Sequence, residues 1–181
     1  MSIIKTDLTK ESQGQLTRQS YEPKSSIQGV TVSETRVFTD DGGSLTELGR
    51  LDRGRLANFP EFEARQINLS QVLPGAIKAF HLHLNQDDIW YVPPTERLLV
   101  VLTDQRQTSP TVGQTTRFVL GAGKSQLVYI PRGVAHGIAN LWTDSATMIY
   151  FVNQHFDLEN PDEHRLPWDF LGKDIWEIAR G

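Results

Sequence analysis

The chain of 181 residues contains no cysteine. Without thiol groups it can form no disulfide, no thiolate zinc site and no cysteine nucleophile. It also has no excess of basic residues, since 18 Lys and Arg stand against 22 Asp and Glu and give a formal net charge of −4. A chain of this charge is not attracted to a phosphate polymer, so we expect no nucleic-acid partner.

Long apolar runs are also missing. The longest uninterrupted run covers residues 98–102, far short of the roughly 20 residues that a membrane-spanning helix needs. Asp7 and Glu11 lie where a secretory signal peptide would have to be apolar. We therefore expect no membrane association and a cytoplasmic location. A length near the ~150 residues of an average domain indicates a single sizeable core.

Composition divides the chain into three regions. Residues 1–29 are polar and lack a hydrophobic period, so alone they would be disordered. We expect this arm to pack on a partner chain, giving a homodimer, with packing on its own barrel as the alternative. Residues 30–160 alternate β-rich runs with turn residues, and residues 161–181 form a tail with a short helix around 175–179.

The expected strands are 30–39, 62–70, 76–84, 97–102, 116–120, 126–130, 135–141 and 146–153. Short strands at roughly even spacing, without a long amphipathic helix, predict an all-β sandwich or barrel such as a double-sheet jelly roll.

Three of the five histidines fall in two strand-like segments. His81 and His83 are two residues apart, so in a strand they share one face with Ile77 and Ala79, while Lys78 lies on the other face. Both faces carry apolar residues, which predicts a strand covered on both sides. His136 follows a tight turn at 131–133. We expect the imidazoles to converge in a concavity as a site, with hydrogen-bonded core or rim histidines as the alternative.

These segments resemble the two cupin motifs. Gly75-x5-His81-x-His83, followed by an acid at Asp87 or Asp88, is similar to the first, with Asp in place of the usual Glu. Pro131-x-Gly-x2-His136-x3-Asn140 is similar to the second. The resemblance implies a double-stranded β-helix, the cupin jelly-roll barrel. It also implies a possible divalent metal, whose ligands would be His81, His83, Asp87 (or Asp88) and His136.

A second resemblance covers residues 36–176. Segments at 37–43, 66–70, 78–81, 108–113 and 126–137, then Tyr150 and Trp168-Asp169, run in the order seen in dTDP-4-dehydrorhamnose 3,5-epimerases. It implies an isomerase that needs no cofactor, acting on a 4-keto sugar, with His81 as general base and Tyr150 as general acid. Substrate-binding residues would be Gln66, Asn68, Lys78, His83 and His136.

The chain departs from that family at charged positions. The expected Lys and one Arg fall on Ile89 and Val92, a further Arg is lost at Asp40–Gly43, and the Arg before the base is Lys78. No counterpart is found for the late Asp that orients the base, and 161–165 is interpreted as a surface turn. Because these cationic side chains are missing, we expect this chain to bind a diphosphate group more weakly than the family does. Two alternatives therefore stay open: a metal-dependent cupin, oxygenase or isomerase, acting on a small acid or sugar, and a non-catalytic sugar-binding cupin.

Overall fold

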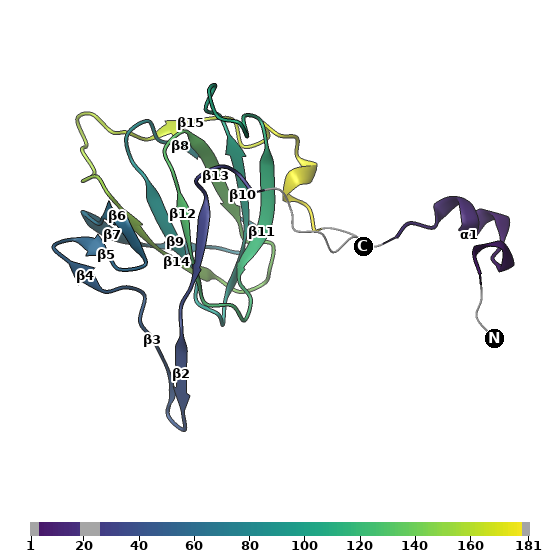
Figure 1. Cartoon of the computed structure of the whole chain (residues 1–181), viewed down its shortest axis with the longest axis horizontal. Coiled ribbons are helices and arrows are strands. Elements are labelled where there is room, and N and C mark those ends of the chain that lie inside the picture. Colours follow the sequence, from purple (N-terminus) through teal and green to yellow (C-terminus); the bar gives the residue numbers. More distant parts are fainter. Residues whose placement is uncertain (1–3, 19–25, 179–181) are drawn as a thin grey trace.

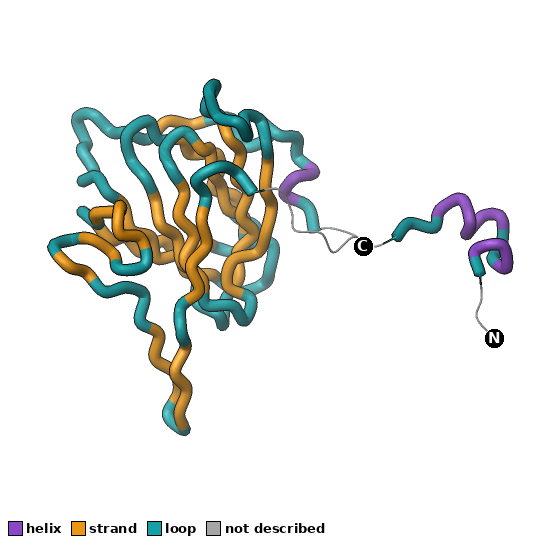
Figure 2. Tube along the Cα trace, in the orientation of Figure 1, coloured by secondary structure: helices purple, strands orange, loops and turns teal. Residues whose placement is uncertain are grey.

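The computed structural model describes residues 4–18 and 26–178, and most of its elements are strands (Figures 1 and 2). Near the N-terminus it has a short 3-10 helix, η1 (Lys5–Asp7), and the helix α1 (Lys10–Gln15). The hydroxyl of Thr9 caps α1 by accepting a hydrogen bond from the Ser12 amide. Neither helix buries a residue. Parts of the predicted arm, 1–3 and 19–25, lie outside the described residues, and its packing on a partner stays a prediction.

Two five-stranded antiparallel sheets form the body of the molecule. The first has the order β1 (Thr31–Glu34), β12 (Gln126–Ile130), β9 (Asp88–Tyr91), β14 (Ala146–Val152) and β7 (Gln66–Val72). The second has the order β11 (Thr115–Gly121), β10 (Arg97–Asp104), β13 (Val134–Ala139), β8 (Ile77–Leu82) and β15 (His164–Arg165). The predicted all-β jelly roll is confirmed.

Smaller elements flank the two sheets. β2 (Val37–Asp40) and β3 (Gly43–Thr46) form a hairpin that projects from the barrel in Figure 1. β4 (Leu51–Asp52), β5 (Arg55–Leu56) and β6 (Phe59–Glu63) form a three-stranded sheet. The expected strand 30–39 is therefore two strands, and β9 was not predicted. The expected tail helix is a 3-10 turn, η2 (Asp174–Trp176), and Ala179 lies outside the described residues.

Three apolar clusters explain why several strands are buried on both faces. One cluster joins the inner faces of the two sheets and includes Trp90, Val100 and Met148. Another lies outside the first sheet, where Ile89 packs with Leu56 and Phe62 of the three-stranded sheet. The third covers the outside of the second sheet with the C-terminal tail; its buried members are Phe80, Leu99, Val101, Ala135, Ala139 and Trp176. Ile27, within the predicted arm, is 2% exposed and joins the inner cluster.

Gly137 lies on β13 where that strand packs closely against Ala79 of β8. A Cβ added there would lie 2.4 Å from the Ala79 Cβ and 3.0 Å from Trp176 Cη2. Gly137→Ala is therefore expected to lower the free energy of unfolding by about 1–3 kcal/mol, because the packed neighbours cannot withdraw. Urea unfolding measures this, with Gly14→Ala in the open helix α1 as the control that loses no stability. Equal urea midpoints for Gly137→Ala and the wild type would contradict the close contact.

Candidate active site

A cavity of about 1040 Å³ lies between the two sheets. Its walls are built by inward-facing side chains of β7, β9 and β14 on one side and of β8 and β13 on the other. The polar and titratable residues that line it are Gln66, Asn68, Ser70, Lys78, His81, His83, Asn85, Gln86, Asp88, Trp90, His136, Tyr150, Gln154, His155, Asp157, Asn160, Asp162, Glu163 and Arg165. All seven residues predicted for catalysis or substrate binding are therefore brought together.

The wall from the second sheet carries three imidazoles. His136 of β13 is paired in register with His81 of β8, and their ring centroids are 6.1 Å apart. The His83 ring, just beyond β8, lies 5.1 Å from that of His136. The register shifts between His136 and Ile138, and Lys78 also lines the cavity rather than lying on the opposite face. Its Nζ donates to the Ser70 hydroxyl at 2.9 Å.

The wall from the first sheet carries several polar side chains on its cavity side. Asn68 of β7 and Trp90 of β9 are the register partners of Tyr150 on β14. The Gln66 amide donates to Asn68 Oδ1 at 2.8 Å. Ile67 and Leu69 alternate with these residues and are 54% and 70% exposed. β7 therefore turns its hydrogen-bonding groups toward the cavity and its apolar groups outward.

A carboxylate accompanies His81. Glu163, the residue before β15, places its Oε1 3.3 Å from His81 Nδ1. The guanidinium of Arg165 pairs with the same oxygen of Glu163 at 2.6 Å. Burial lowers the pKa of His81 below its ordinary 6.5; the charge of Arg165 also lowers it, and that of Glu163 opposes the shift. A carboxylate from Glu163 therefore accompanies His81, although the family's late Asp has no counterpart, and the interpretation of 161–165 as only a surface turn is wrong.

The two adjacent aspartates have different partners. Asp87 accepts hydrogen bonds from the Arg132 guanidinium at 2.8 and 3.0 Å and from the Asn153 amide at 3.0 Å. Asp88 turns into the cavity, where Trp90 Nε1 donates to its Oδ2 at 3.0 Å and Gln86 Nε2 to its Oδ1 at 2.8 Å. Strand alternation separates the two carboxylates because β9 begins at Asp88.

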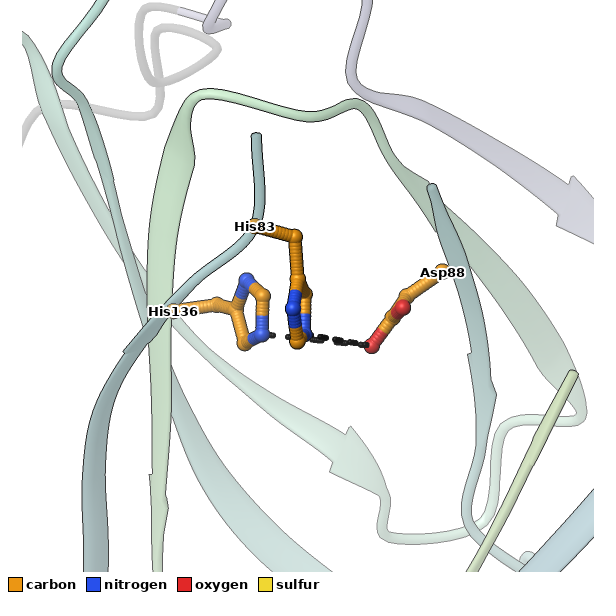
Figure 3. A group of neighbouring side chains, drawn as sticks. All are labelled: His83, Asp88 and His136. Atoms are coloured by element: carbon orange, nitrogen blue, oxygen red, sulfur yellow. Dashed lines mark ion pairs between the residues drawn. The ribbon is translucent and has the colours of Figure 1, made fainter. Parts of the chain in front are cut away.

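Asp88, rather than Asp87, meets the histidines. Its Oδ2 lies 3.9 Å from Nε2 of His83 and 3.9 Å from Nε2 of His136, and these three side chains point toward one another in Figure 3. Among the described residues this is the group whose ligand atoms could hold a metal ion, and it includes neither His81 nor Asp87. The sequence-based ligand set is corrected at these two positions.

Burial sets the protonation of the deeper groups. It lowers the pKa of His136 well below 6.5 and raises that of Asp88. It also raises the pKa of the Tyr150 phenol above its ordinary 10, and the negative charges of Asp88 and Glu163 add to the shift. At neutral pH the imidazoles of His81 and His136 on one wall are therefore neutral, and the phenol of Tyr150 on the other wall is protonated.

Several lining residues were missed by sequence reasoning. Trp90 is not among the predicted site residues, yet its ring lies edge-on to that of His136 with centroids 5.0 Å apart. Asp162 accepts backbone hydrogen bonds from Leu84, Asn85 and Gln86 and so fixes the loop after His83. The period of two in β9 was the available signal for Trp90. Contacts between segments 76–78 residues apart leave no local signal in the sequence.

Ile89 and Val92, where the resemblance put the family's Lys and Arg, are fully buried in apolar clusters and do not line the cavity. Among the lining residues the basic side chains besides histidine are Lys78 and Arg165. The helical elements of the described residues, η1, α1 and η2, are all too short to span a membrane.

A jelly roll whose cavity faces neutral imidazoles with a phenol is a cupin built for proton transfer, the chemistry of an isomerase. The model of the dTDP-4-dehydrorhamnose 3,5-epimerase family matches residues 24–172, and the chain belongs to that family of isomerases.

Relatives and solved structures agree with this assignment. The chain is 41% identical over 143 residues to the spore coat polysaccharide biosynthesis protein SpsL of Bacillus subtilis (strain 168), covering 79% of this chain and 91% of that protein. It is 32% identical over 143 residues to the probable low-salt glycan biosynthesis epimerase Agl13 of Haloferax volcanii, covering 79% and 89%. The crystal structure of a dTDP sugar isomerase from Desulfovibrio desulfuricans G20 matches with a TM-score of 0.70 and 28% identity, covering 80% of this chain and 88% of that one.

Proposed function

We propose that this enzyme epimerises a dTDP-linked 4-keto sugar by removing and returning a proton at a carbon next to the keto group. The observation that carries the proposal is the pairing of His81 on one sheet with Glu163, across the cavity from Tyr150 on the other sheet. A base and an acid on opposite walls can act on opposite faces of a sugar ring, and proton return to the opposite face inverts the carbon.

His81 is the general base in this proposal. Its Nδ1 lies 3.3 Å from a carboxylate oxygen of Glu163, so the neutral ring carries its hydrogen on Nδ1 and directs the Nε2 lone pair to the substrate. The C–H bond next to the keto group breaks, its electron pair forms the enolate, and the proton moves to Nε2. Glu163 acts by positioning the ring and stabilising the imidazolium.

Tyr150 is the general acid that completes the inversion. The enolate carbon takes the phenolic proton from the opposite face, and bulk water restores the proton balance of His81 and Tyr150. Lys78 supplies positive charge for the enolate oxygen, and Gln66 and Asn68 hold sugar hydroxyls through their amides. These proton transfers use the chain's own groups and require no cofactor.

The pH profile tests the role of Glu163. Its charge raises the pKa of His81, against burial and Arg165. Glu163→Gln is therefore expected to lower that pKa further and to move the acid limb of kcat/KM to lower pH, because the base stays neutral longer as pH falls. Loss of ring positioning should also lower kcat about 10- to 100-fold.

Glu159→Gln is the matched control, because Glu159 is exposed and does not line the cavity; its profile should match the wild type. Glu163→Asp should recover part of kcat. An acid limb that stays in place or moves to higher pH in Glu163→Gln would contradict the proposed pairing.

Deuterium exchange tests the proposed reaction. The enzyme is incubated in D2O with 4-keto sugars linked to dTDP, UDP, GDP or CDP, and with the free sugar. We expect deuterium at carbons next to the keto group, together with an inverted product, fastest with the dTDP sugar. Absence of exchange above the enzyme-free rate across the whole panel would favour the non-catalytic sugar-binding alternative.

We also propose that the enzyme is a homodimer. Two edges of the first sheet expose large apolar side chains, Val32 on β1 and Ile67 and Leu69 on β7, and the projecting hairpin exposes Phe38 and Leu45. Unpaired edges with apolar side chains favour association with a second copy. Analytical ultracentrifugation tests this, and a monomer at micromolar concentration would contradict it. A cytoplasmic location stays a prediction.

A further inference from the structure

Beyond the proposed proton transfer, the cavity contains a second arrangement of chemical groups. His83, Asp88 and His136 come from three segments of the chain and are 7%, 3% and 3% exposed. One nitrogen or oxygen of each lies within 4.8 Å of the other two. Figure 3 shows the two rings and the carboxylate directed at a common point. The proton transfers assigned to His81 and Tyr150 make no use of this convergence.

Backbone carbonyls fix the tautomers of both rings. Nδ1 of His136 lies 3.0 Å from the Val134 carbonyl oxygen, and Nδ1 of His83 makes a hydrogen bond to the Asp162 carbonyl oxygen. A carbonyl only accepts, so each neutral ring carries its hydrogen on Nδ1. Each Nε2 then holds a lone pair, and it is Nε2 of both rings that lies 3.9 Å from Asp88 Oδ2.

Hydrogen bonds also fix the orientation of the Asp88 carboxylate. Trp90 Nε1 and Gln86 Nε2 donate to the two oxygens of Asp88 and fix its orientation. The same Gln86 nitrogen lies 3.3 Å from Nε2 of His83, and a cation would displace this longer contact. Outer hydrogen bonds of this kind, from carbonyls to imidazoles and from donors to a carboxylate, are those that orient metal ligands in proteins.

We propose that His83, Asp88 and His136 bind one divalent transition-metal ion such as Zn²⁺, Co²⁺, Fe²⁺ or Mn²⁺. Two imidazole nitrogens and one carboxylate oxygen are a ligand set that these ions accept, with bonds of about 2.0–2.2 Å. Asp88 Oδ2 lies 3.9 Å from each of the two ring nitrogens. Small rotations of the side chains would shorten these separations to the roughly 3 Å expected between two ligands of one ion. Because all three residues line the cavity, the remaining coordination positions face it and are available to water or a sugar oxygen.

The metal site is separate from the proposed base. Glu163 engages His81, which is not part of the group. Metal binding and proton abstraction can therefore be measured independently, and failure of one leaves the other standing.

Cobalt titration of the untagged, chelator-treated full chain tests the site. Co²⁺ is added without substrate, its visible absorption bands report nitrogen and oxygen coordination, and Zn²⁺ is then added in competition. We expect one ion per chain. His83→Gln, Asp88→Asn and His136→Gln should each weaken Co²⁺ binding by about 100-fold or more, and Trp90→Phe by about tenfold.

His81→Gln and Asp87→Asn are the matched controls and should bind Co²⁺ as the wild type does. Circular dichroism establishes that each variant is folded, and the wild-type titration stands even if one variant is not. Absence of stoichiometric Co²⁺ bands in the wild type overturns the proposal, and so does equal binding by all three ligand variants. Weaker binding in Asp87→Asn than in Asp88→Asn would also overturn it.

Discussion

His81→Gln is expected to lower kcat/KM for epimerisation about 10³-fold and to abolish deuterium exchange above background. The amide of Gln has no basic lone pair with a pKa near neutrality, so the C–H bond next to the keto group loses its proton acceptor. General bases contribute typically 10²–10⁴-fold to rate. The ring is half-buried and pairs with Glu163. Exchange measured by NMR in D2O, with the dTDP-linked 4-keto sugar, gives the result directly.

The same substitution at a surface histidine is the control. His164 lies on β15 next to Glu163, its side chain is 50% exposed, and it does not line the cavity. His164→Gln should retain the wild-type exchange rate. Exchange in His81→Gln above a tenth of the wild-type rate would mean that another group is the base.

The pattern of turns and apolar residues predicted most of the barrel because burial acts strand by strand. β10, for example, has a continuous apolar run and is buried along almost its whole length, as expected of a strand covered on both faces. β9 escaped prediction because it begins with a charged residue, Asp88, that is buried by hydrogen bonds from Trp90 and Gln86. The spacing of apolar residues in the sequence gives no indication that hydrogen bonds allow a carboxylate to be buried at this position.

In the candidate site, too, relations between neighbouring residues were predictable from the sequence and long-range pairings were not. The period of two placed His81 and His83 in one cavity, because that relation is local. The choice between Asp87 and Asp88 depended on which carboxylate met Arg132, a residue 45 positions away. The approach of Glu163 to His81 depended on β15 pairing with β8. Long-range pairings of this kind are settled by tertiary packing, and no periodicity in one sequence encodes them.

Tyr150→Phe is expected to separate proton exchange from inversion. Removing the hydroxyl leaves His81 able to form the enolate, so deuterium should still enter the substrate. The proton or deuteron then returns from the imidazole to the face it left, and formation of the inverted product should fall about 10²- to 10³-fold. Burial, with Asp88 and Glu163, raises the pKa of the phenol above 10, so wild-type inversion should decline only at a pH beyond that value, where the phenol loses its proton.

Tyr91→Phe provides the matched control, since Tyr91 is buried on the adjacent β9, bonds to Ser125 at 3.3 Å and packs outside the cavity. It should leave both rates unchanged. If Tyr150→Phe lost exchange and inversion together, the phenol would be needed to form the enolate. If it lost neither, the second proton would come from another donor on the β7, β9 and β14 wall. Exchange without inversion would identify Tyr150 as the acid because that outcome requires an intact base and a missing donor on the opposite face.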